Sequence, residues 1–223
     1  QVTLAKMAGL ARGKLIVGDA SGDPAALAVG SNTYVLTSDG TDTAWAAAGG
    51  GGSMVFISSA TASDAATISF TSIGSTYDRY VFTLEAITPA TDAAALHLLT
   101  STDNGSSYDT GSSDYASVVR YSNAGVVRTD VNDNDAFCRV GPPTGNASTE
   151  SVNGVMELWA PSNTALFTQI TSNGTYSHTD GNPKHFEGGG GRKSAGDVDA
   201  VQFKMASGNI ASGTIRLYGI AKS

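Results

Sequence analysis

Apolar and polar residues alternate with a period of two along much of this chain, and no other feature constrains the fold as strongly. Tyr80, Phe82 and Leu84 would share one face of a strand, as would Ile215 and Leu217 near the end. No stretch of helical periodicity extends beyond a turn or two. The 27 glycines lie among dense Ser, Thr, Asn and Asp, which predicts many turns and therefore many short strands. The sequence predicts an all-β protein.

Hairpin signals support an antiparallel arrangement of these strands. Asn173-Gly174 favours a type I′ turn, and Ser122–Gly125 separates two runs rich in valine. Roughly ten short strands after the glycine run favour a two-sheet β-sandwich that is jelly-roll-like. The further strand candidates are Val55–Ser58, Thr67–Thr71, Leu96–Thr100, Val152–Ala160 and Leu166–Ser172.

Four consecutive glycines, Gly49–Gly52, divide the chain. Glycine has no side chain to pack and loses the most backbone entropy on ordering, which predicts a flexible joint here. We therefore expect an N-terminal shaft or anchoring segment over residues 1–48, a glycine linker over 49–53 and the C-terminal β-sandwich domain over 54–223.

The N-terminal segment holds three short apolar runs, and we expect three strands there. Segments of fewer than about 50 residues normally need disulfides, metals or assembly to fold. Cys138 is the single cysteine, so a disulfide within one chain is excluded. We expect an intertwined β shaft in a homotrimer, and the alternative is an arm that folds on another protein. The trimer-core candidates are Leu15, Val17, Leu27, Val29, Val35 and Leu36.

The charge balance limits the partners of this protein. Thirteen basic and twenty acidic residues give a net charge of −7, which repels phosphate. No run approaches the roughly 20 apolar residues that a membrane span needs. We therefore expect neither nucleic-acid binding nor membrane insertion.

Two passages resemble structural proteins of tailed bacteriophages. Residues 13–47 contain a Gly18-Asp19-Ala20 turn, an apolar run ending in Gly30, a Leu36–Gly40 turn and then Trp45. This order resembles a module that recurs in phage tail fibres. Residues 98–118, LLTSTDNGSSYDTGSSDYASV, are similar to a signature in the C-terminal domains of phage virion proteins.

The resemblance implies a structural component of the phage particle, a tail fibre or a head fibre or spike, exposed on the surface of the virion. It implies a homotrimer that attaches to other virion proteins through its N-terminal segment and touches bacterial surface polysaccharide through its C-terminal domain. It transfers no catalytic residues, so we expect no enzyme. The alternatives are a spike that hydrolyses envelope glycans or their esters, and a capsid decoration protein without a receptor.

Five side chains are candidates for glycan contact, since an aromatic ring offers apolar area beside polar edges. For Trp159, at the end of a predicted strand, packing in the core or at a trimer contact is favoured over glycan contact. The candidates are Tyr108, Tyr121, Trp159, Tyr176 and His178.

Three passages come close to ligand-binding motifs without matching them. Gly188–Gly191 precedes Arg192-Lys193-Ser194, but Arg192 interrupts the phosphate-loop pattern, so we expect a flexible surface loop. Asp130–Asp135 lacks the Gly and Glu of a calcium loop, so a solvated loop is expected. His178 and His185 flank a turn and are expected to be exposed, with a spacing that is not diagnostic of a metal site. We predict no cofactor, no metal and no catalytic residues.

Overall fold

The structure is a computed structural model that describes residues 10–47, 54–123 and 125–221. Contacts within the chain divide it into two compact units, residues 1–52 and 53–223. All regular structure in the described residues is β-strand, which confirms the predicted all-β class. None of these residues forms a helix that could cross a membrane. The linker predicted over residues 49–53 lies outside the described residues.

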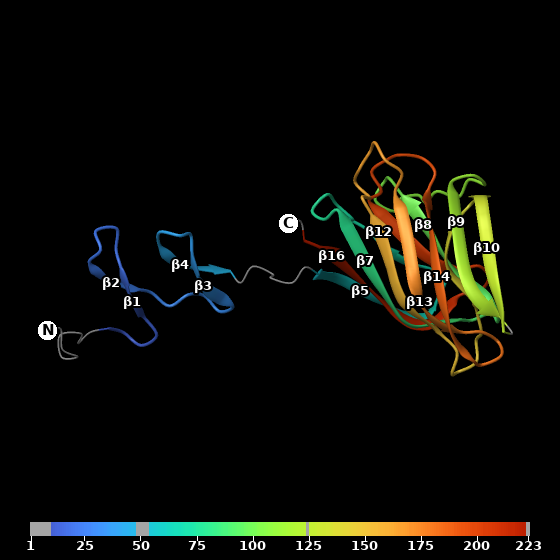
Figure 1. Ribbon diagram of the computed structural model, residues 1–223, viewed down its shortest axis with the longest axis horizontal. Coiled ribbons are helices and arrows are strands. Elements are labelled where there is room, and N and C mark those ends of the chain that lie inside the picture. The colour runs from blue at the N-terminus through green and yellow to red at the C-terminus, as the bar shows by residue number, and fades with distance from the viewer. Residues whose placement is uncertain (1–9, 48–53, 124, 222–223) are drawn as a thin grey trace. The chain divides into compact units, whose positions relative to one another are not determined.

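The described part of the first unit, residues 10–47, contains two antiparallel hairpins (Figure 1). One joins β1 (Leu15–Gly18) to β2 (Pro24–Leu27), and the other joins β3 (Tyr34–Ser38) to β4 (Thr43–Ala47). The sequence predicted three strands. The one predicted over residues 27–29 is displaced, since β2 ends at Leu27, and the fourth strand, Thr43–Ala47, was missed because alanine has a low preference for strands.

An aspartate holds the turn of each hairpin. Asp19 Oδ1 accepts hydrogen bonds from the backbone N–H groups of Ser21 and Asp23, and Asp39 Oδ1 accepts them from Thr41 and Asp42. Such carboxylate-to-backbone bonds imitate a backbone turn. These acidic residues therefore act in local structure.

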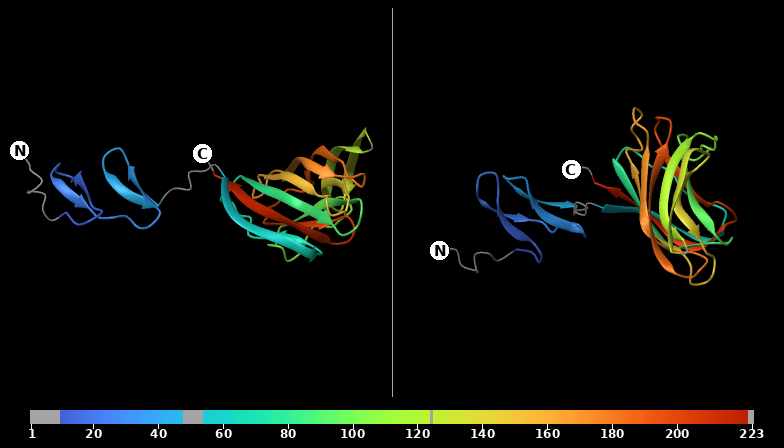
Figure 2. Two further views of the ribbon diagram at one scale, coloured as in Figure 1. Left: turned by 90° about the horizontal axis from the view of Figure 1, so that it is seen from below. Right: turned by 45° about the vertical axis from the view of Figure 1, so that its right-hand side comes forward.

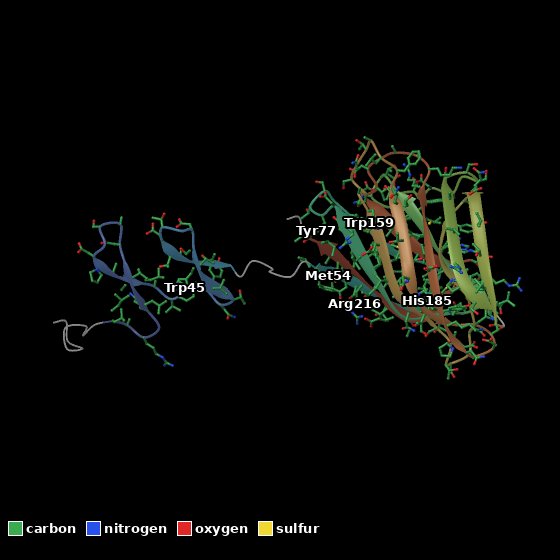
Figure 3. The ribbon with its side chains drawn as sticks, viewed as in Figure 1. Trp45, Met54, Tyr77, Trp159, His185 and Arg216 are labelled. Atoms are coloured by element: carbon green, nitrogen blue, oxygen red, sulfur yellow. The ribbon has the colours of Figure 1, made fainter. Side chains whose placement is uncertain are left out.

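Trp45 connects the second hairpin to the segment that follows the first (Figure 3). Its indole Nε1 donates a hydrogen bond of 2.6 Å to the carbonyl oxygen of Ala28. A Cβ atom at Gly30 would lie 2.6 Å from the indole ring, so the ring fits there because residue 30 has no side chain. The tryptophan of residues 13–47 thus contacts the end of the apolar run that closes with Gly30.

The second unit contains two antiparallel sheets (Figures 1 and 2). The eight-stranded sheet has the order β10-β9-β14-β13-β12-β7-β16-β5, and the four-stranded sheet has the order β11-β8-β15-β6. The strands of the large sheet are β5 (Met54–Ala65), β7 (Arg79–Pro89), β9 (Tyr115–Asn123), β10 (Val126–Asp135), β12 (Val152–Trp159), β13 (Gln169–Ser177), β14 (Pro183–Arg192) and β16 (Ile210–Ile220). Those of the small sheet are β6 (Ile68–Phe70), β8 (Ala94–Ser101), β11 (Cys138–Thr144) and β15 (Ala200–Met205).

The strand order is that of a jelly roll with two added hairpins. Without the hairpins β9-β10 and β13-β14, eight strands remain, in the orders β5-β16-β7-β12 and β6-β15-β8-β11. Numbered along the chain, these are 1-8-3-6 and 2-7-4-5, the arrangement of a jelly roll. Both hairpins extend the large sheet beyond β12, and they form the broad row of strands in Figure 1. The predicted jelly-roll-like sandwich is confirmed.

Three phenylalanines from both sheets meet in the core. Phe82 on β7 lies edge-to-face with Phe70 on β6 and Phe203 on β15, with ring centroids 5.4 and 5.3 Å apart. The alternation predicted for β7 holds through Leu84, which is buried. It then breaks, because Ala86 has a positive φ of 50° and the next residue, Ile87, turns into the core instead.

Two glycine-based predictions are wrong. Gly188–Gly191 lies inside β14, and Asn173-Gly174 lies inside β13 rather than in a hairpin turn. Both strands are central in the large sheet, where neighbouring backbones come very close. A Cβ at Gly190 would lie 2.3 Å from the carbonyl oxygen of Ala116, and one at Gly174 would lie 2.2 Å from that of Asn153. At these positions glycine allows neighbouring strands to approach closely. In the sequence alone, such glycines cannot be distinguished from the glycines of turns.

The acidic run Asp130–Asp135 is also part of a strand and not a solvated loop. It forms the end of β10, at the edge of the large sheet. Asp130 accepts hydrogen bonds from Tyr121 on β9 and Arg139 on β11, the latter as an ion pair. This pair joins the edges of the two sheets.

Candidate functional site

An open groove of about 510 Å³ lies on the large sheet, over β13, β14, β9 and β10. Its floor is formed by Gly189–Gly191, and Val118, Val131 and Phe167 are its apolar lining. Gln169 and Asp133 supply polar groups. We call this feature the glycine groove. Its volume falls within the range of roughly 300–1,000 Å³ that is usual for small-molecule sites.

Two basic side chains at the end of the glycine groove are already bonded. Lys193 Nζ donates to the carbonyl oxygen of Asp133 at 2.8 Å and also to the Asn134 side chain, linking the end of β14 to β10. Arg192 Nε donates to Asp109 Oδ2 at 2.7 Å. Both cations therefore hold the groove in shape.

None of the five predicted glycan-contact side chains lines the glycine groove. Tyr176 is 1% exposed and Tyr121 is buried beside it, with ring centroids 6.1 Å apart. The hydroxyl of Tyr176 donates to the carbonyl oxygen of Ser122. These two tyrosines belong to the core, because the side chain of each lies on the inner face of its strand. Their prediction as surface contacts is therefore wrong.

The other three candidates remain at least partly accessible. Tyr108 is half-buried against the core, and His178 is half-buried with its Nδ1 2.9 Å from the hydroxyl of Thr179. Trp159 is 37% exposed, stacks under the Arg79 guanidinium at 4.8 Å and donates to Thr171 Oγ1 (Figure 3). Trp159 is therefore not a core residue, and the trimer contact that the favoured prediction also allowed stays a prediction. His185 is exposed, as predicted.

In the polar loop of residues 101–107, the carboxylate of Asp103 stabilises the conformation of the loop itself. Asp103 accepts hydrogen bonds from the backbone and hydroxyl of Ser107 and from the hydroxyl of Ser101. The bonds from Ser107 lower the pKa of Asp103 to about 2. Asn104 continues the loop with a positive φ of 57° and accepts a bond from the N–H of Ser72.

Groups suited to catalysis or metal binding are sparse in the described part of the chain. No cluster of three or more His, Cys, Asp or Glu side chains there could hold a metal ion. Burial raises the pKa of the Cys138 thiol to about 12, so the thiol stays protonated and is not a nucleophile.

His97 is a buried histidine held neutral by its surroundings. It lies in β8, in register with Arg139 on β11 and Lys204 on β15, and its ring stacks on Phe137 at 3.6 Å. Its Nε2 makes no hydrogen bond with the described residues. Burial, and then the charges of Arg139 and Lys204, lower its pKa to about 3.

We expect His97 to make the protein less stable as the pH falls from 6.5 to 4.5. In this window the unfolded chain binds a proton at His97 and the folded chain does not, so stability falls by about 1.4 kcal/mol per pH unit. Carboxylates with lowered pKa values, such as Asp103, titrate below this window. Urea unfolding at several pH values should show the slope, and His97→Asn should flatten it; an unchanged slope in this variant would contradict the assignment.

Comparisons of the chain with protein-family models, curated proteins and solved structures found no match.

Proposed function

We propose that the protein is a structural subunit of a bacteriophage fibre or spike that works as a homotrimer. In this proposal, residues 1–48 form a shaft or anchor completed by other copies, and residues 54–223 form the head. The absence of a buried core among residues 10–46 carries the proposal. The resemblance of residues 13–47 to a tail-fibre module supports it and suggests a place on the surface of the virion.

Across residues 10–46, no side chain is buried. Of the six trimer-core candidates, Val17 and Leu27 are half-buried and the other four are between 40% and 60% exposed. Ordering each residue of a chain costs roughly 1–2 kcal/mol, and two hairpins without a core offset little of it. Symmetric association with other copies would bury these side chains and cover the strand edges.

Apolar exposure continues into the first strand of the second unit. Met54, Phe56 and Ile57 are all exposed on β5, which is an edge strand of the large sheet. Contiguous exposed apolar side chains mark interaction surfaces in soluble proteins. The second unit therefore also offers an apolar strand that association with other copies would cover.

Light scattering coupled to size exclusion tests the proposal. We expect the full chain to have three times the mass of one chain, and a fragment of residues 54–223 to have a smaller assembly state while remaining folded. Val35→Asp should lower the mass of the full chain, since it places a charge where three copies would meet. Asn32→Asp, in the exposed turn before β3, is the matched control and should remain trimeric.

A monomeric full-length chain would contradict the trimer and favour an arm that docks on another virion protein. Incubation with bacterial surface polysaccharide tests the enzyme alternative. Release of reducing ends or of acetate would replace the structural role with a hydrolase or an esterase.

A further inference from the structure

We infer that the glycine groove binds a neutral oligosaccharide, with Phe167 as its stacking platform and Gly189 as its floor. The inference rests on the proposed function for its biological meaning, since a fibre head that binds glycan would act as an adhesin. Its evidence comes from the second unit alone.

Gly189 is the glycine of β14 that packing does not explain. Added Cβ atoms at Gly188, Gly190 and Gly191 would lie 2.8, 2.3 and 2.4 Å from their nearest neighbours. At Gly189 the nearest atom would be the carbonyl oxygen of Ile170 at 3.5 Å, an ordinary contact, and its φ is not positive. A side chain would therefore fit at position 189.

The side chain missing at Gly189 would occupy the glycine groove. Gly189 pairs with Val118 on β9 and Thr171 on β13, both of which are exposed. A side chain at position 189 would therefore lie on the outer face of the sheet. Glycine inside a strand weakens the strand and often marks close approach of a ligand or another backbone. Since crowding by this chain's own backbone is excluded at this position, approach of a ligand or of another copy is the remaining reason, and the lining of the groove favours a ligand.

The lining of the groove fits a sugar. Phe167 is 58% exposed and presents a ring, while Val118 and Val131 add apolar area on β9 and β10. Sugar rings stack their C–H faces on such surfaces and hydrogen-bond at their edges. Gln169 and Asp133 are the groups available for these bonds.

Charge favours a neutral ligand. The net charge of −7 opposes acidic glycans, and the cations at the groove, Arg192 and Lys193, are bonded to Asp109 and to residues 133–134. Asp133 is the one carboxylate among the described lining residues, whereas glycoside hydrolysis uses two facing carboxylates. Binding without cleavage is therefore the chemistry that the groove supports.

The test is a binding measurement on the full chain. An array of neutral oligosaccharides of hexoses and N-acetylhexosamines, with a matched set containing uronic acids, would identify the best ligand for titration calorimetry. We expect binding to the neutral set. Phe167→Ala and Gly189→Leu should each weaken binding at least tenfold, the first by removing the platform and the second by filling the floor.

Leu166→Ala is the matched control, because Leu166 is as exposed as its neighbour Phe167 and does not line the groove. Its affinity should equal that of the parent chain. No binding to neutral glycans, or binding that survives both groove variants, would overturn the inference.

The mass of each variant is measured on the same samples. A mass that falls in Gly189→Leu would mean that the groove is a subunit contact, whereas a trimer without glycan binding would refute the inference and leave the fibre proposal standing.

Discussion

Replacing Phe82 with alanine is expected to lower the free energy of unfolding by about 3–5 kcal/mol. The ring is fully buried and contacts Phe70 and Phe203, which belong to the opposite sheet. Its removal deletes a contact that joins the two layers and leaves a cavity that the surrounding strands cannot fill. Because domains are stable by roughly 5–15 kcal/mol, the variant should lose a large share of its stability.

Urea unfolding followed by far-ultraviolet dichroism measures this effect, at one protein concentration for all variants because assembly adds to the apparent stability. Phe167→Ala is the matched control, since it removes the same ring from an exposed loop and should change stability by no more than about 0.5 kcal/mol. Equal losses in the two variants would show that the two sheets do not pack through Phe82.

Much of the fold was predictable because side-chain alternation records which residues face the core. The alternation at Tyr80–Leu84 and at Ile215–Leu217 located β7 and β16, and the valine-rich runs around Ser122–Gly125 located the β9-β10 hairpin. The same rule failed for the glycines of β13 and β14. A residue without a side chain carries no inward or outward signal, so its sequence looks the same in a strand and in a loop.

The candidate site was not predictable for a different reason. Phe167, Val118 and Gly189 come from three separate segments, and each is unremarkable in its local sequence. The predicted contacts of Tyr121 and Tyr176 were wrong because the face on which each side chain lies depends on strand register, which composition does not reveal. One signal was available in the sequence. Four glycines between a phenylalanine and a basic pair lose much conformational entropy when they are ordered in a strand. That cost indicates a position where the fold needs the space that a side chain would occupy.

Gly190→Ala is expected to destabilise the protein by about 3 kcal/mol, at the upper end of the typical cost of overpacking. The added methyl would lie 2.3 Å from the carbonyl oxygen of Ala116 and 2.8 Å from the Cα of Ser117. Both are backbone atoms of β9, which pairs with β14, so no side-chain rotation relieves the contact. We expect β9 and β10 to separate from the sheet, with faster hydrogen exchange at their amides.

Gly189→Ala is the control one residue away. Its methyl would meet the carbonyl oxygen of Ile170 at an ordinary 3.5 Å. Replacing glycine where the backbone already suits alanine restricts the unfolded chain and stabilises by about 0.4–1 kcal/mol. Two adjacent glycine-to-alanine variants should therefore differ by about 3–5 kcal/mol in opposite directions, as measured by urea unfolding. If both variants were as stable as the parent, residues 188–191 would form a surface loop and the floor of the glycine groove would not exist.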